Sequence, residues 1–226
     1  MREELEESRT AAELLPWVRE KMAEFRSTEE GKRAIRFRQG FAKQLVEEAL
    51  PLGLFASLHF QASDHVTINL VLGNQNYDAT VEDRREQKSP FTFIEVTQAH
   101  EGENDYLRML ALDRNGHVSA HGGVRKTGTK ATGIHVKVES TAQSHSTLLT
   151  QELDRIEAAI QRKMGKPYPP DTALVVACND YTFMWKEPEM MALRSRLTPL
   201  LCNLSSFRWL AVVGIEQRVF EEFDLR

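Results

Sequence analysis

The stretch FTFIEVTQAH, residues 91–100, places a carboxylate inside a short run of strand-forming residues. Successive side chains of a strand point to opposite faces, so Glu95 is expected to share a face with Phe93 and Thr97. A carboxylate among apolar groups is costly unless it is paired, protonated or bound to a cation. We therefore expect Glu95 either to belong to a charged site or to lie where the end of the sheet meets water.

A second carboxylate, Asp78, lies in NYDAT, residues 76–80, which is the preceding run of strand-forming residues. Two acids on neighbouring strands repel each other, and a shared divalent cation is one way to remove that repulsion. The charged segment EDRREQKSP, residues 82–90, is typical of a hairpin loop that ends at Pro90. The local pattern therefore predicts a hairpin that carries Asp78 and Glu95 on its two strands.

Composition limits the classes of protein that the chain can form. Its 226 residues, of which 41% are hydrophobic, are enough for one good core, and no apolar run approaches the length of a membrane span. The polar start MREELEESRT does not resemble a signal peptide, so we expect a cytoplasmic protein that does not bind membranes. A formal charge of −4 gives no overall attraction to nucleic acid, so such binding requires a local basic patch.

Two helices are expected at the start of the chain. Thr10 to Glu13 and Ser27 to Glu30 both match the capping-box pattern, which predicts helices over residues 11–25 and 29–50, the second ended by Pro51. The polar face of the second helix is either solvated or in contact with phosphate, and Arg36 is the candidate residue for that contact. We expect residues 1–26 to form an N-terminal helical arm and residues 27–226 to form one domain.

The rest of the chain alternates between strand and helix patterns. Strands are expected over residues 54–60, 66–72, 77–81 and 91–97, and a helical spacing follows within residues 101–112. The final third predicts a helix over 149–164, a buried strand over 173–178, a helix over 188–201 and a second buried strand over 209–215. This order favours an α/β fold with a mixed central sheet flanked by helices.

A local basic patch lies between residues 114 and 137, where no acidic residue occurs. Glycines let a backbone approach a phosphate closely, and cationic side chains neutralise that phosphate. The candidate nucleic-acid-binding residues of the patch are Arg125, Lys126, Lys130 and Lys137. The alternative interpretation is a glycine-rich hairpin or loop whose charges only keep it soluble. The patch contains no aromatic residue, which argues against a platform for single strands.

Motifs of several large enzyme classes are absent from the sequence. It contains neither the phosphate loop of the P-loop NTPases nor the nucleophile elbow of the α/β hydrolases. The glycines near Gly122 do not have the spacing of a dinucleotide-binding fingerprint. The histidines of this half lack the spacing of a zinc site.

The order of elements and the two acids resembles the PD-(D/E)XK nuclease superfamily over about residues 29–176. The resemblance is carried by VEEALPLG (46–53), NYDAT (76–80) and FIEVTQA (93–99), and segments further along the chain also look like uncharacterised bacterial proteins of this type. It implies a restriction-endonuclease-like fold and a site in which Asp78 and Glu95 hold Mg²⁺ or Mn²⁺. By the same resemblance, the carbonyl of Val96 adds a ligand, and Glu47 or Glu48 is the helical acid.

One position departs from the pattern of the superfamily. Thr97 stands two residues after Glu95, where a lysine is usual. Lys126, Lys130 and Gln98 are the candidates to replace that lysine, and the other interpretation is a degenerate site. Thr97 and Gln98 therefore join Asp78 and Glu95 as candidate catalytic residues.

Three hypotheses follow for the function. The first is a metal-dependent nuclease that acts on DNA, with RNA as the alternative substrate, in a bacterial defence system or a mobile element. The second is a catalytically degenerate nuclease-like module that binds nucleic acid or a protein partner. The third is a regulatory subunit that docks through its N-terminal helix. The sequence leaves open whether the chain forms a homodimer or a larger complex.

Overall fold

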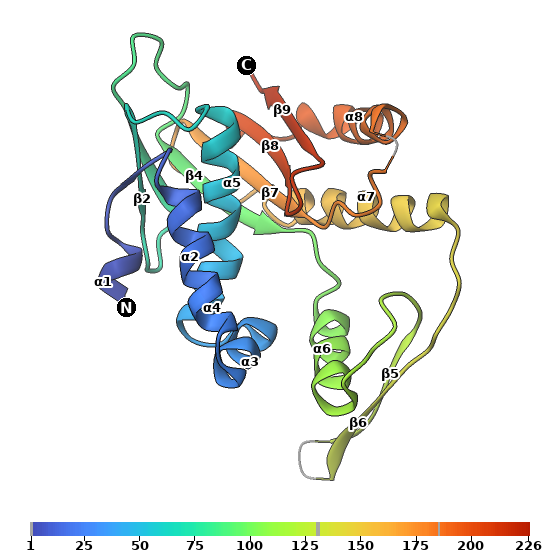
Figure 1. Ribbon diagram of the computed structural model, residues 1–226. Coiled ribbons are helices and arrows are strands. Elements are labelled where there is room, and N and C mark those ends of the chain that lie inside the picture. Colours follow the sequence, from blue (N-terminus) through green and yellow to red (C-terminus); the bar gives the residue numbers. More distant parts are fainter. Residues whose placement is uncertain (1, 130–131, 185) are drawn as a thin grey trace.

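The computed structural model describes residues 2–129, 132–184 and 186–226, and its centre is a mixed sheet of seven strands (Figure 1). Across the sheet the order is β1 (Arg9–Thr10), β2 (Val66–Leu70), β3 (Ala79–Asp83), β4 (Phe93–Gln98), β7 (Thr172–Cys178), β8 (Trp209–Gly214) and β9 (Phe220–Asp224). Strands β1 to β4 pair antiparallel, β4, β7 and β8 pair parallel, and β9 returns antiparallel. The expected mixed α/β sheet is confirmed.

Helices cover both faces of this sheet. They are α1 (Arg2–Leu5), α2 (Leu14–Arg26), α3 (Glu29–Phe37), α4 (Phe41–Gln44), the π-helix η1 (Leu45–Ala49), α5 (Leu50–His59), α6 (Glu103–Asn115), α7 (His145–Gln161) and α8 (Glu187–Leu201). Helices α2 and α5 pack on one face, while α7 and α8 pack on the other. Every residue of β7 is buried because both of its faces are covered, which explains its continuous apolar run. No helix within the described residues is long and apolar enough to cross a membrane.

The N-terminal segment is part of the main core, so the expected division at residue 26 does not separate an arm from a domain. Leu14 and Val18 of α2 are fully buried in the same cluster as Ile68 of β2. The reciprocal bonds of the predicted capping box form, because the Thr10 amide donates to Glu13 Oε2 at 3.0 Å and the Glu13 amide donates to Thr10 Oγ1 at 3.3 Å, but the α-helix begins at Leu14 and not at residue 11. An apolar helix stripe of this kind is stable only when another surface covers it.

The single helix expected over residues 29–50 is instead broken, and the strand expected over 54–60 is wrong. Thr28, not Ser27, caps α3, since its hydroxyl accepts from the Gly31 amide at 3.0 Å. Left-handed backbone at Arg38 (φ 51°) and Gly40 (φ 54°) ends α3 and starts α4 in a new direction. Pro51 lies in the first turn of α5, where a missing amide is tolerated, so the helix continues to His59. Residues 54–60 are apolar without a clear period, which does not distinguish a buried helix from a strand.

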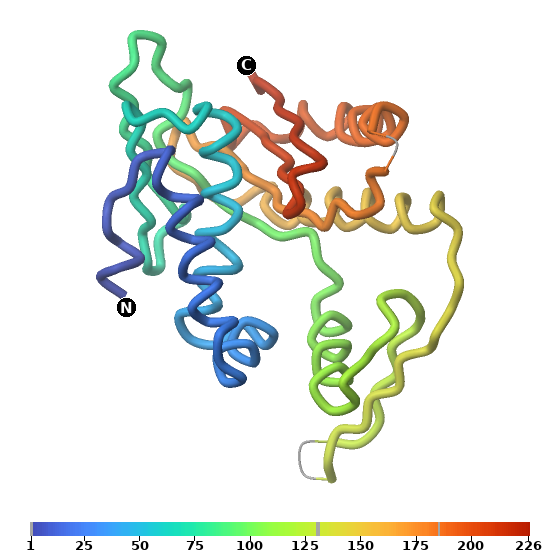
Figure 2. The backbone as a smooth tube through the Cα atoms, in the orientation of Figure 1, coloured from blue at the N-terminus to red at the C-terminus, as the bar shows by residue number. Residues whose placement is uncertain are grey.

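An insertion between β4 and α7 contains α6 and a separate two-stranded ribbon, β5 (Val124–Thr129) and β6 (Gly133–Val138). Figures 1 and 2 show that this insertion projects away from the central sheet, to which its two ends are joined. It also contacts α3, because Arg36 Nη1 lies 2.8 Å from Asp113 Oδ1 of α6 and the rings of Phe37 and Tyr106 meet edge to face.

Candidate functional site

The predicted hairpin of β3 and β4 brings Asp78 and Glu95 into one charged centre. Asp78 directly precedes β3, and its amide donates to the Ile94 carbonyl at 2.8 Å. The Asp78 carboxylate turns toward β4 and accepts a hydrogen bond of 2.7 Å from the Val96 amide. Glu95 is only 8% exposed. The two acids that the sequence singles out are therefore neighbours on adjacent strands.

A lysine that the sequence analysis did not consider completes this centre. Lys163 Nζ, just after the end of α7, lies 2.5 Å from Glu95 Oε1. Because Glu95 is buried, this ion pair provides the cation that its charge requires. Of the residues considered as replacements for the missing lysine, Lys126 instead pairs with Glu103 at 2.6 Å, and Gln98 donates to the Val46 carbonyl at 3.0 Å. Lys130 lies outside the described residues.

The pKa of Asp78 is raised to about 6. Burial is the main cause and the negative charge of Glu95 adds to it, while the Val96 amide and Lys163 oppose the rise. A carboxylate with this pKa binds a proton or a cation readily near neutral pH. The positive charge of Lys163 therefore does not neutralise all of the negative charge of Asp78 and Glu95.

A third carboxylate, Glu48 of the π-helix η1, lies close to the same centre. Burial raises its pKa to about 7, and the charges of Asp78, Glu47 and Glu95 add to the shift. Glu47 is engaged elsewhere, because its Oε1 lies 3.1 Å from Arg38 Nη1. Consecutive helix residues point in different directions, so only one of the two acids can face the sheet. The structure favours Glu48 over Glu47 as the helical acid.

The strand that carries Glu95 also orients two further candidate residues. The N–H and C=O of a strand residue point to the same side, and the Val96 amide reaches the Asp78 carboxylate. The Val96 carbonyl therefore faces that side as well, beside Asp78. Thr97 is 8% exposed and lies on the same face as Glu95, toward α7. Gln98 fixes the end of β4 to η1 through its bond to Val46.

Tyr168 is a buried polar residue of this centre that sequence patterns did not indicate. Its hydroxyl is buried and forms no hydrogen bond with any described residue. Burial raises its pKa, and the charges of Glu95 and Asp78 raise it further, so the phenol lies near both acids. The ring packs on Phe207 with centroids 4.5 Å apart. A buried hydroxyl without a partner is a place where a water molecule or a ligand gains a hydrogen bond.

Basic groups surround the end of β4 beside the carboxylates. Arg162 Nη2 donates to the Gln98 carbonyl at 3.0 Å, and the Gly102 amide donates to His100 Nδ1 at 2.8 Å. The pKa of His100 is lowered by burial and by the positive charges of Arg38 and Arg162. Arg162 and Arg38 thus form a cationic rim next to an anionic centre, while His100 accepts a hydrogen bond and has its charged form disfavoured.

The residues expected to bind nucleic acid lie apart from the carboxylates. Arg125 and Lys137 are exposed on one face of the ribbon of the insertion, whereas Lys126 belongs to the other face and pairs with Glu103 of α6. Arg36 instead joins α3 to α6 through Asp113. The structure therefore gives Arg36 a structural ion pair and leaves the ribbon as the exposed basic element.

The donor set is suited to a hard divalent cation. Within the described residues, no three side chains of His, Cys, Asp or Glu are grouped so as to hold one metal ion. Mg²⁺ commonly binds proteins through one or two carboxylates and takes its other ligands from water and substrate phosphates. Asp78, Glu95 and the Val96 carbonyl fit that mode of binding. Glu95 would then bind the ion in place of Lys163.

Comparison of the chain with models of protein families, with curated proteins and with solved structures finds no match. The site itself, with two neighbouring buried carboxylates and the lysine that pairs with one of them, is therefore the basis for a functional proposal.

Proposed function

We propose that the protein is a metal-dependent nuclease that hydrolyses phosphodiester bonds of DNA. The observation that carries the proposal is the position of Lys163 on Glu95, beside Asp78, because it supplies the lysine that Thr97 does not. The order of elements also agrees with a restriction-endonuclease-like fold, since a helix bearing Glu48 precedes three antiparallel strands, a helix and a parallel strand.

Asp78, Glu95 and the Val96 carbonyl would hold Mg²⁺ or Mn²⁺ in this proposal. The ion supplies a Lewis acid that polarises the phosphate and makes a bound water more acidic. Glu48, with its pKa of about 7, is suited to take a proton from water near neutral pH. Water would add to phosphorus and give its proton to Glu48, the bond from phosphorus to the leaving oxygen would break, and that oxygen would take a proton from solvent.

Lys163 stabilises charge in this reaction. With the carboxylates holding an ion, the ammonium group of Lys163 would be able to contact a phosphate oxygen or the attacking water. Arg162 and Arg38, near the end of β4, would hold the neighbouring phosphates. The side chains thereby divide into an anionic centre for the cation and a cationic rim for the substrate.

A second candidate function is a module that binds nucleic acid without cutting it. The contact between Lys163 and Glu95 favours it, because an internal cation already neutralises one carboxylate. This alternative predicts binding to DNA that does not depend on a divalent cation and no cleavage products.

The test is cleavage of labelled duplex DNA with Mg²⁺ or Mn²⁺ by wild type and by Asp78→Asn, Glu95→Gln and Lys163→Met. Each variant is expected to lose activity by about 100-fold or more, since each removes a group that acts at the phosphate. Lys166→Met, three residues beyond Lys163 and exposed, is the matched control and should cleave normally. Full activity in Asp78→Asn or Glu95→Gln would refute the nuclease proposal. Binding without cleavage in wild type would support the second candidate.

A further inference from the structure

The ribbon of β5 and β6 has two unlike faces. Arg125 pairs across the ribbon with Lys137, and Thr127 pairs with His135, so these four side chains share one face. The other face carries half-buried Val124, Ile134, Val136 and Val138. Lys126 also belongs to this second face, and it reaches Glu103 at the start of α6. The second face therefore packs toward α6, and the first points outward.

The outward face is cationic and rich in hydrogen-bond donors. Arg125, Thr127, His135 and Lys137 are all exposed. Within the described residues, the carboxylate that this face meets is Glu139, which lies 3.1 Å from Arg125. The two strands of the ribbon contain no phenylalanine, tyrosine or tryptophan. Such a face complements a row of phosphates, and His135 is the one ring that its described residues offer to an unpaired base.

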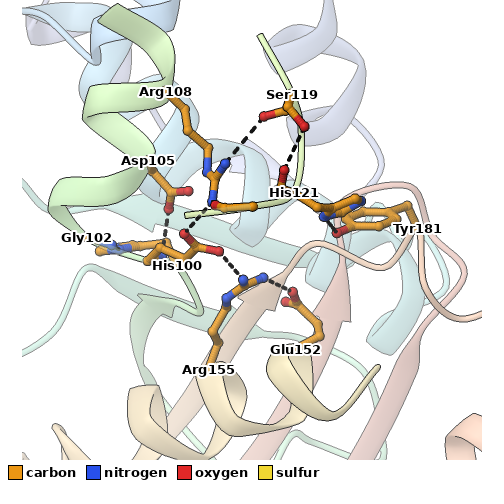
Figure 3. A network of polar contacts seen from close by, with 11 residues as sticks. His100, Gly102, Asp105, Arg108, Ser119, His121, Glu152, Arg155 and Tyr181 are labelled. Atoms are coloured by element: carbon orange, nitrogen blue, oxygen red, sulfur yellow. Dashed lines mark hydrogen bonds and ion pairs between the residues drawn. The ribbon is translucent and has the colours of Figure 1, made fainter. Parts of the chain in front are cut away.

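A buried ion network fixes the base of the ribbon to the core (Figure 3). Arg108 of α6, 8% exposed, donates to the Gly122 carbonyl at 2.7 Å and to the Ser119 carbonyl at 3.3 Å. It also lies 3.2 Å from Glu101, which pairs in turn with Arg155 of α7. The segment that leads into β5 is therefore bonded to α7 through charged groups.

The same network continues into the interior of the protein. Arg155 Nη1 lies 2.9 Å from Oε2 of Glu152, a residue that is 1% exposed, and Glu152 accepts from the Asn179 amide at 3.2 Å. Arg155 lies about 9 Å along the axis of α7 from Gln161, the last residue of the helix, at 1.5 Å per residue. Helix α7 and the turn that follows it thus connect the anchor of the ribbon to Lys163 of the carboxylate centre.

We infer that the outward face of this ribbon docks double-stranded DNA and delivers its backbone to the carboxylate centre. A two-stranded ribbon fits the major groove of B-form DNA, whereas the major groove of A-form RNA is too deep and narrow. A single-strand platform stacks successive bases on several aromatic rings, and the described residues of this face provide only His135. The inference takes nucleic acid as substrate from the proposed function, and it adds the form of the substrate and the surface that binds it.

The test measures binding in the presence of EDTA, so that cleavage plays no part. Fluorescence anisotropy compares a duplex DNA, one of its single strands and the RNA duplex of the same sequence over a range of salt. Lys137→Gln removes one outward charge, and Lys126→Gln is the matched control, because it removes the same charge from the inward face. Loss of one phosphate contact should lower the salt slope by about 0.9 and the affinity about eightfold at 0.1 M salt. Arg125→Gln combined with Lys137→Gln should give about twice that change in slope.

We expect the protein to bind duplex DNA most tightly. The outward substitutions should weaken this binding, and Lys126→Gln should change the affinity by less than about twofold from that of wild type. Equal effects of Lys137→Gln and Lys126→Gln would overturn the assignment of the face. Tighter binding of single strands or RNA, or no binding of any nucleic acid, would overturn the choice of partner. If the binding results hold and wild type does not cleave with Mg²⁺, the docking surface stands and the proposed nuclease activity fails. Circular dichroism of the variants checks that these exposed substitutions leave the fold intact.

Discussion

Replacement of Glu48 by glutamine tests directly whether the carboxylate centre holds excess negative charge. In the folded protein the pKa of Glu48 is about 7, compared with 4.5 for an ordinary glutamate, because of burial and of the charges of Asp78 and Glu47. A raised pKa means that the folded state binds a proton more tightly than the unfolded state. The contribution of Glu48 to stability is therefore complete below about pH 4.5 and is lost as the pH rises through 7.

The size of the effect follows from this shift. A difference of 2.5 pH units, from 4.5 to about 7, corresponds to about 3.4 kcal/mol at most. Glu48 is half-buried, and solvent screening reduces that figure to roughly 2 kcal/mol. Glu48→Gln should thus raise the free energy of unfolding by about 2 kcal/mol at pH 8 and change it little at pH 4.

Urea denaturation at pH 4, 6 and 8 measures this difference, with Glu47→Gln as the matched control. The control removes the neighbouring acid. Loss of its ion pair with Arg38 and relief of its repulsion of Glu48 oppose each other, so stability should change by less than about 1 kcal/mol. A gain that is the same at all three pH values, or a gain in Glu47→Gln that equals that of Glu48→Gln, would refute the reasoning. Added Mg²⁺ should reduce the difference in free energy of unfolding between Glu48→Gln and wild type at pH 8, because an ion that binds the folded wild type stabilises it by mass action.

Other substitutions test the remaining buried polar groups. Lys163→Met should lower the free energy of unfolding at neutral pH by about 3 kcal/mol, because it leaves Glu95 buried and unpaired. Glu95→Gln in the same chain should restore most of that loss. A double variant as unstable as the single one would contradict the pairing. Tyr168→Phe removes a buried hydroxyl that has no described partner. Thermal unfolding should therefore show a stability equal to that of wild type or about 1 kcal/mol above it. A clear loss of stability would mean that the hydroxyl is hydrogen-bonded. Arg155→Met should cost about 3 kcal/mol at pH 8 and less at pH 5, where Glu152 with its pKa of about 7 is protonated, and a cost independent of pH would contradict the network.

Local patterns in the sequence predicted the elements that depend on neighbouring residues. The Thr10 capping box, the hairpin bearing Asp78 and Glu95 and the closing alternation of helix and strand were all predictable. Each of these depends on residues close together in the chain or on a regular apolar period. The same reasoning failed for α5, because an apolar run without a period fits a buried helix and a buried strand equally well.

The sequence by itself determined that the chain has a mixed sheet with helices, an acid on each of two adjacent strands and a glycine-rich basic segment. Only the tertiary structure decided that Lys163 meets Glu95, that Glu48 rather than Glu47 faces the sheet, and that Arg36 belongs to an internal ion pair. The physical reason is distance along the chain. A local pattern specifies which way a side chain points from its own helix or strand, whereas the partner that it meets depends on how those elements pack over the core.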